Sequence, residues 1–139
     1  MKTIELLLFD NKRKQELVTE LKRYRIPQKR IQIISYVYNY LDRCGESHLH
    51  NKVRFSKNDC HIERGYDFHI SVYMRFFSGG EDDNPMVECT ASVKGLTGEI
   101  SFMFCEDDYF ALFCQDFTRT MERLQGILSH KSNILPVRP

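Results

Sequence analysis

The hydrophobic pattern opens with two segments at helical spacing. Residues 11–25 form the first predicted helix, because their apolar residues recur three and four positions apart along one helical face. Pro27 ends that helix and suits the first turn of a second one, which we expect to run to about Arg43, with a strand as the alternative because β-branched residues and tyrosines are frequent there. The periodicity of the preceding segment, TIELLLF, does not decide between a helical turn and a short strand. The expected inward residues are Leu17, Val18, Leu21 and Tyr24 in the first helix, and Ile31, Ile34, Val37 or Tyr38, and Leu41 in the second.

The middle of the chain changes to a period of two. Residues 66–76 alternate between apolar and polar side chains, which predicts a long half-buried strand. Residues 87–93 and 100–104 alternate in the same way and are joined by KGLTG, which is typical of a hairpin, while residues 53–55 indicate a shorter strand before them. One-sided alternation favours an antiparallel meander with one covered face. The inward residues are expected to be Val53, Phe55, Tyr66, Phe68, Ile70, Val72, Met74, Phe76, Val87, Cys89, Ala91, Val93, Ile100, Phe102 and Phe104.

The strongest helical pattern begins at Asp108. Its apolar residues recur at intervals of three and four, and this helix should lie across the apolar face of the sheet. The end of the chain, from about residue 132 to 139, is predicted to be a loosely held tail. Without repeats or linkers, we expect one α+β domain over residues 1–139: a four-stranded antiparallel meander, covered on one face by the N-terminal helices and a long C-terminal helix. The inward residues of this helix are Phe110, Phe113, Phe117, Met121, Leu124 and Leu128.

The composition and the cysteine pattern indicate a cellular location. The 139 residues carry a net charge of +1 and contain no apolar run long enough to cross a bilayer, so no membrane partner is expected. The first residues lack the basic segment and the following apolar core of a signal peptide, so none is expected. Five cysteines, an odd number without a C-x-x-C pair, favour reduced thiols and a cytoplasmic location.

Residues 60–70, CHIERGYDFHI, contain four candidate metal ligands, Cys60, His61, Glu63 and His69. The H-x-E of zinc deaminases requires a helix start and a later P-C-x-x-C. Here the surroundings indicate a turn and a strand, and the later segment PMVEC does not complete the motif. We therefore interpret these residues as the polar positions of a strand, with His69 on its outer face.

A looser cluster, from Cys44, His48, His50, Cys60 and His61, lacks the close ligand pairs of structural zinc sites. Cysteines 89 and 114 are predicted to be small core residues rather than nucleophiles. No phosphate-binding loop, G-x-S-x-G or H-E-x-x-H motif is present. The sequence therefore predicts no metal, no cofactor and no enzymatic activity.

Charge is distributed unevenly. Residues 1–64 carry 14 Lys and Arg against 8 Asp and Glu, whereas residues 65–139 carry 6 against 11. The densest basic stretch, residues 12–30, could follow a phosphate backbone, with Tyr24 available to stack on a base. Its basic residues fall around much of the helix, however, so nucleic-acid binding is the second interpretation.

Two acidic triplets are the more ordered signal. Glu81-Asp82-Asp83 lies between the second and third predicted strands, and Glu106-Asp107-Asp108 follows the fourth and starts the last helix, where acids also favour the helix dipole. A meander brings these positions to the same end of the sheet. We expect one anionic edge that binds a basic protein, with the adjoining polar sheet face completing the interface. The predicted partner-binding residues are Glu81, Asp82, Asp83, Glu106, Asp107, Asp108, Tyr73, Arg75 and Met103.

The leading functional hypothesis is a small cytosolic protein-binding module. It would be an inhibitor or immunity-type protein that neutralises a basic partner, such as a nuclease toxin, by occluding its active site through the acidic edge. The alternatives are a nucleic-acid-binding module that uses residues 12–30, a secretion-type chaperone and, after these, an enzyme with a diffuse site.

Overall fold

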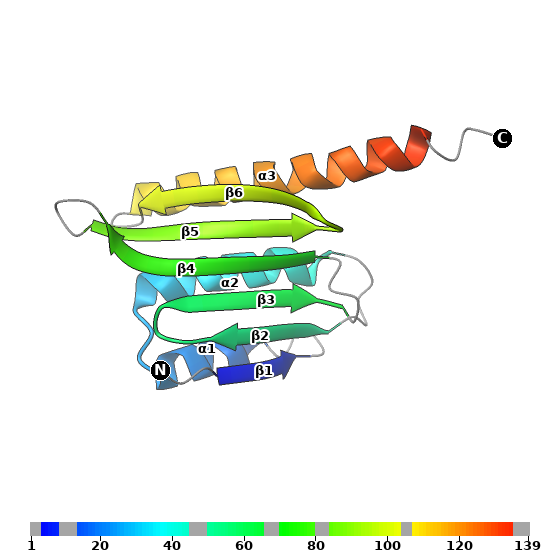
Figure 1. Ribbon diagram of the computed structural model, residues 1–139. Helices are drawn as coiled ribbons and strands as arrows, with labels where there is room; N and C mark the ends of the chain where they lie inside the picture. The colour runs from blue at the N-terminus through cyan, green and yellow to red at the C-terminus, as the bar shows by residue number, and fades with distance from the viewer. Residues whose placement is uncertain are drawn as a thin grey trace.

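The computed structural model describes residues 4–8, 14–44, 50–65, 70–79, 84–103 and 107–134. Its strands form one antiparallel sheet in which each strand pairs with its neighbours in sequence, so the chain has an α+β fold as predicted (Figure 1). Within these ranges no helix is both long and apolar enough to span a membrane. The elements are β1 (Ile4–Leu8), α1 (Lys14–Arg23), α2 (Gln28–Asp42), β2 (Asn51–Phe55), β3 (Asp59–Arg64), β4 (Ile70–Gly79), β5 (Asn84–Val93), β6 (Leu96–Met103) and α3 (Asp107–Ile134).

The sheet has six strands, so the prediction of four was wrong. The undecided segment near the start is strand β1, which pairs with β2 and places Ile4 opposite Phe55. Its sequence, IELLL, lacks the alternation by which the other strands were found. Strand β3 was missed because its inward positions are Cys60, Ile62 and Arg64, and an arginine interrupts the apolar pattern.

The predicted alternation in the later strands is confirmed. The inward residues of β4 and β5 from Val72 to Val93 are buried, and Phe102 in β6 is half-buried. Lys94 and Gly95 form the two-residue β5–β6 turn with φ angles of 49° and 91°. These left-handed values match a type I′ hairpin, in which glycine relieves the steric cost. The expected strand positions 66–69, with His69, and Phe104 lie outside the described residues.

Helices α1 and α2 form as predicted, and the strand alternative for α2 is wrong. Helix α1 ends where Arg25 adopts a φ of 60°, with the Ile26 amide donating to the Leu21 carbonyl over 3.0 Å. This is a Schellman end, which lets Pro27 start α2 directly. Ile33 is buried although it was not predicted to be. It is an additional inward residue of α2, a helix that packs against both α1 and the sheet.

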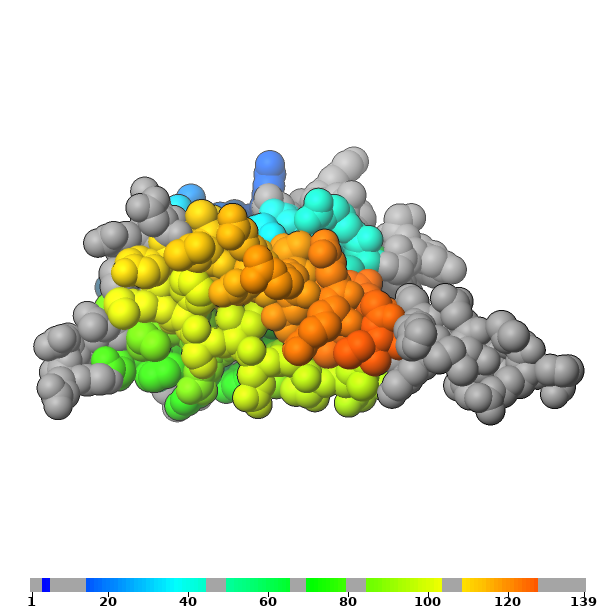
Figure 2. Space-filling model, turned by 90° about the horizontal axis from the view of Figure 1, so that it is seen from above, coloured from blue at the N-terminus to red at the C-terminus, as the bar shows by residue number. Residues whose placement is uncertain are grey.

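Helix α3 packs along β5 and β6, while α2 packs on β3 and β4, so all three helices lie on one face of the sheet (Figure 1). Seen from above, α3 and α2 form one layer beside the strands (Figure 2). The close approach of α3 requires a glycine beneath it, because a Cβ on Gly98 would lie 2.5 Å from Thr120 Cγ2. Helix α3 continues to Ile134, into the segment predicted as a tail, and residues 135–139 lie outside the described residues. Phe113, Phe117, Met121 and Leu124 are buried and Phe110 is half-buried, whereas the Leu128 side chain is outside the described part.

Two tyrosines of α2 join it to α3. The Tyr36 hydroxyl hydrogen-bonds with Thr118 Oγ1 and donates to the Cys114 carbonyl over 3.2 Å. The Tyr40 hydroxyl accepts a hydrogen bond from Gln125 Nε2 at 3.1 Å. Both tyrosine rings meet Phe117 edge-on, with centroids 6.0 and 5.4 Å away. The polar tips of the tyrosines are thereby satisfied while their rings stay in the apolar layer.

A buried arginine joins β3 to the end of α2. The side chain of Arg64 is 2% exposed and its Nη1 lies 3.3 Å from Asp42 Oδ1. Its Nε donates to the Cys44 carbonyl over 2.9 Å, and Nη1 also lies 3.3 Å from Asn51 Oδ1. The inward charge in β3 is therefore compensated by an anion and by amide and carbonyl oxygens, as a buried cation requires.

Candidate functional site

One face of the sheet is turned away from the three helices, and no described element covers it. We call it the open face and define it by the strand side chains that alternate with the buried ones. Cross-strand register places these side chains in rows, for example Glu5, Arg54, His61, Tyr73, Thr90 and Glu99 from β1 to β6.

The charged strand residues of the open face are unequal in number. Within the described part of the chain, five are carboxylates and three are cations, which gives a net charge of −2. Each cation is close to a carboxylate of the same face. The pairs are Lys52 with Glu5 at 3.7 Å, Arg54 with Glu63 at 2.7 Å, and Arg75 with Glu88 at 2.8 Å.

Two carboxylates of the open face, Asp59 and Glu99, have no cation partner among the described residues. Asp59 is held instead by neutral donors. Ser56 Oγ donates to its Oδ1 over 2.6 Å, and the Tyr73 hydroxyl donates to its Oδ2 over 3.1 Å. Burial and the neighbouring Asp59 raise the pKa of Tyr73, which keeps its hydroxyl protonated as a donor.

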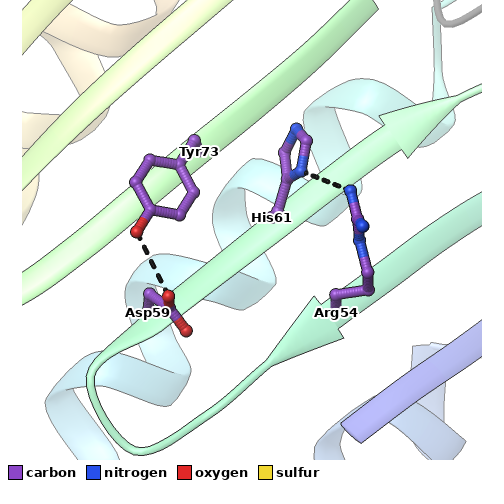
Figure 3. A pocket seen from close by; sticks show the side chains of 4 residues that line it. All are labelled: Arg54, Asp59, His61 and Tyr73. Carbon is purple, nitrogen blue, oxygen red and sulfur yellow. Dashed lines mark hydrogen bonds between the residues drawn. The ribbon is translucent and has the colours of Figure 1, made fainter. Parts of the chain in front are cut away.

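A hollow of about 190 Å³ lies at this position, lined by Arg54, Asp59, His61 and Tyr73 (Figure 3). Its residues come from three adjacent strands, β2, β3 and β4. In Figure 3 Asp59 and Tyr73 lie on one side of His61, and Arg54 lies on the other. The hollow therefore has an anionic side and a side where the cation is already paired.

His61 lies between these two sides of the hollow. His61 Nδ1 lies 3.0 Å from Arg54 Nη2 and 3.2 Å from Glu63 Oε1, so it contacts both members of the Arg54–Glu63 ion pair. Burial lowers the pKa of His61, and Arg54 lowers it further, against the opposing effect of Glu63 and Asp59. The ring is therefore neutral at pH 7.

The lowered pKa of His61 should make the folded protein less stable at acidic pH. The unfolded chain takes up a proton on His61 near pH ~6.5, whereas the folded chain takes it up only at lower pH. We expect the free energy of unfolding to fall as the pH drops below ~6.5, because the unfolded state then binds more protons. Urea titrations across this range should show a weaker pH dependence for His61→Gln than for the wild type. Equal pH dependence in both proteins would contradict the assignment.

The predicted partner-binding residues are only partly within the described structure. Tyr73, Arg75 and Met103 all lie on the open face, as expected for the polar sheet face. Arg75 also stacks on Phe77, with its Cζ 4.5 Å from the ring centroid. Phe77, Met86 and Met103 are aligned by register into a half-buried apolar row at one end of the sheet.

The elements that precede and follow both acidic triplets in sequence meet at that same end of the sheet. The end of β4, the start of β5, the end of β6 and the start of α3 lie together on the left of Figure 1. Glu81, Asp82, Asp83 and Glu106 lie outside the described residues, as do the side chains of Asp107 and Asp108. The anionic edge therefore remains a prediction.

The structure separates the candidate metal ligands. His61 and Glu63 lie in strand β3, and Cys60 points to the buried side while His61 points to the open face. Burial raises the pKa of the Cys60 thiol. Cys44 and His50 are at the ends of α2 and β2, and His48 lies outside the described residues. In the described ranges no three His, Cys, Asp or Glu side chains are placed to share a metal ion.

Cys89 and Cys114 differ in burial. Cys89 is buried, and burial raises the pKa of its thiol to about 12, as expected for a core residue. Cys114 is only half-buried on α3, where burial also raises its pKa.

The basic stretch lies on the helical side of the sheet. Lys22, Arg23 and Arg25 are exposed there, whereas Arg30 donates to the Lys57 carbonyl over 2.6 Å and stacks on Phe76. Arg23 is 3.6 Å from Glu20. Part of the basic character is therefore used within the fold.

No protein family, curated protein or solved structure matches this chain, so its function is argued from geometry. Sequence reasoning missed Arg54, Asp59 and His61 as members of a surface site. Alternation in DCHIER, with Cys60 and Ile62 inward, was the signal that could have placed Asp59 and His61 on the polar face, and the inward Val53 and Phe55 could have done the same for Arg54.

Proposed function

We infer that the chain is a protein-binding module of the inhibitor or immunity type, which docks its open face and the adjoining edge onto a basic protein. In this role it occludes the active site of the partner. A nuclease toxin fits this partner class best, because a surface that holds nucleic-acid phosphates is positively charged.

The observation that carries this proposal is the charge balance of the open face. All three of its described strand cations are paired with carboxylates. The carboxylates of Asp59 and Glu99 have no cation partner among the described residues. A surface that is anionic after internal pairing attracts a basic partner during encounter and disfavours acidic ones.

The adjoining end of the sheet adds an apolar surface to the charged open face. The apolar row of Phe77, Met86 and Met103 is flanked in sequence by both acidic triplets. An apolar centre with a charged rim is the usual arrangement of a protein–protein interface. The triplets would strengthen the field of Asp59 and Glu99 toward a basic surface.

Nucleic-acid binding remains the second candidate function. It would use the exposed Lys22, Arg23 and Arg25 on the helical side, opposite the open face. Its affinity would fall steeply with salt as counterions return to the phosphates. The two candidates therefore use different faces, and variants on each face separate them.

The test begins with capture from nuclease-treated extract of the source cells, followed by identification and purification of the retained protein. Its affinity is then measured for wild type, for Glu88→Lys/Glu99→Lys on the open face, and for Asp82→Lys/Asp83→Lys/Asp107→Lys on the edge. Lys22→Glu/Arg23→Glu is the control, because it changes the net charge by four units, as the open-face pair does, but in the opposite direction and on the helical side.

We expect a basic partner, at least a tenfold loss of affinity for both acidic variants, and little change for the control. An acidic partner, or affinity that both acidic variants retain, contradicts the proposal. A saturable complex with RNA or duplex DNA that only the control variant weakens would instead promote the nucleic-acid function.

A further inference from the structure

We propose that the hollow around Asp59 receives the guanidinium group of an arginine side chain of the partner. This inference rests on the proposed function, because it names the chemical group by which the basic partner is recognised at the open face.

The net charge of the hollow is that of one carboxylate. Arg54 and Glu63 are 2.7 Å apart and neutralise each other, and His61 contacts this ion pair through Nδ1. Arg75 stands opposite Asp59 in the strand register, but its Nη2 lies 2.8 Å from Glu88 Oε2. Asp59 is therefore the uncompensated charge, and a cation is the complementary guest.

Asp59 is also prepared for a bidentate partner. A carboxylate offers about four acceptor positions, and Ser56 and Tyr73 each use one, on different oxygens. With respect to the residues that the structure describes, one acceptor position per oxygen remains. Two parallel N–H donors of a guanidinium match this arrangement, and such paired contacts are stronger than neutral hydrogen bonds. The two hydroxyl donors fix the orientation of the carboxylate before the guest arrives.

The cavity has room for a guanidinium group. Its volume of about 190 Å³ far exceeds the roughly 30 Å³ share of one water molecule, which leaves room for a planar group of four heavy atoms. Tyr73 is 38% exposed and offers its ring beside Asp59. Arginine stacks on aromatic rings and is less strongly hydrated than lysine, so it is the preferred cation here.

The position of Arg54 determines the side from which a guest cation enters the hollow. In Figure 3 its guanidinium lies beyond His61, on the side away from Asp59 and Tyr73. A guest cation that enters beside Tyr73 therefore has the imidazole ring between itself and Arg54. Glu63, which is bound to Arg54, reduces the remaining repulsion.

The experiment uses the whole protein and three small probes: the acetylated amides of arginine, lysine and citrulline. Citrulline has nearly the shape of arginine without its charge. The ring signals of Tyr73 and His61 are followed by nuclear magnetic resonance at constant ionic strength. We expect saturable shifts with the arginine probe, with a dissociation constant in the millimolar range, weaker shifts with lysine and none with citrulline.

Single-residue variants then test whether the arginine probe binds in the hollow. Asp59→Asn should weaken arginine binding at least tenfold, and Tyr73→Leu, at a partly exposed position, should weaken it severalfold. Glu99→Gln removes one negative charge from the same face outside the hollow, and it should change the affinity less than twofold.

Saturable binding of citrulline, stronger binding of lysine than of arginine, or equal effects of Asp59→Asn and Glu99→Gln would overturn the proposal. These outcomes concern the hollow alone. A basic partner whose binding depends on Glu88 and Glu99 but not on Asp59 would leave the proposed function in place. Conversely, arginine binding in a chain that captures no basic partner would refute the proposed function alone.

Discussion

Replacing Arg64 with methionine is expected to lower the free energy of unfolding by about 3–5 kcal/mol, because it leaves a buried carboxylate without its cation. Asp42 lies 3.3 Å from Arg64, and its side chain is only 14% exposed. The Cys44 carbonyl loses its donor as well. Since small domains are stable by only about 5–15 kcal/mol, the loss should be evident in urea unfolding followed by circular dichroism.

Two further variants separate charge compensation from packing. Arg64→Met/Asp42→Leu removes both ions and should be more stable than Arg64→Met, because apolar replacement of a whole buried pair is often neutral. Arg43→Met removes an exposed arginine from the end of α2 and should change stability by less than about 0.5 kcal/mol. A loss below about 1 kcal/mol in Arg64→Met would contradict the role given to this arginine.

Phe117→Ala is expected to cost about 3–5 kcal/mol, the range for truncating a buried phenylalanine. Phe117 is fully buried and its ring contacts Tyr36, Tyr40 and Phe113, so it joins α3 to α2 at the centre of the helical layer. The variant removes this contact and leaves a cavity. Thermal and urea unfolding should both register the loss.

Leu112→Ala is the matched control on the same helix. Leu112 is 47% exposed, and its truncation should change the free energy of unfolding by no more than about 0.5 kcal/mol. Similar losses for the two variants would mean that α3 does not pack on the sheet through the Phe117 face.

Periodicity predicted the helices and the later strands because their burial is one-sided. Phe113, Phe117 and Met121 recur at helical spacing since α3 has one buried stripe, and Val87 to Val93 alternate since β5 has one buried face. The same logic failed for β3, where Arg64 occupies an inward position. Its compensation comes from Asp42 and Cys44, which are distant in sequence.

The site was less predictable than the fold. Tyr73 and Arg75 were placed on the polar face by alternation alone, but Asp59 is adjacent to Tyr73 only through the β3–β4 register. Which carboxylates stay without a cation depends on side-chain pairing across several strands. A single sequence contains the charges but not that pairing, so the asymmetry of the open face follows only from the structure.

Carboxylate labelling of the complex tests the central claim, that the open face binds the partner. A water-soluble carbodiimide and an amine are applied to the free chain and to its complex with the purified basic partner, and modification is quantified at Asp59, Glu99 and Glu122. We expect Asp59 and Glu99 to be protected in the complex, while Glu122, exposed on the helical side, is modified equally in both states. Protection of Glu122 with unchanged modification of Asp59 and Glu99 would contradict the account.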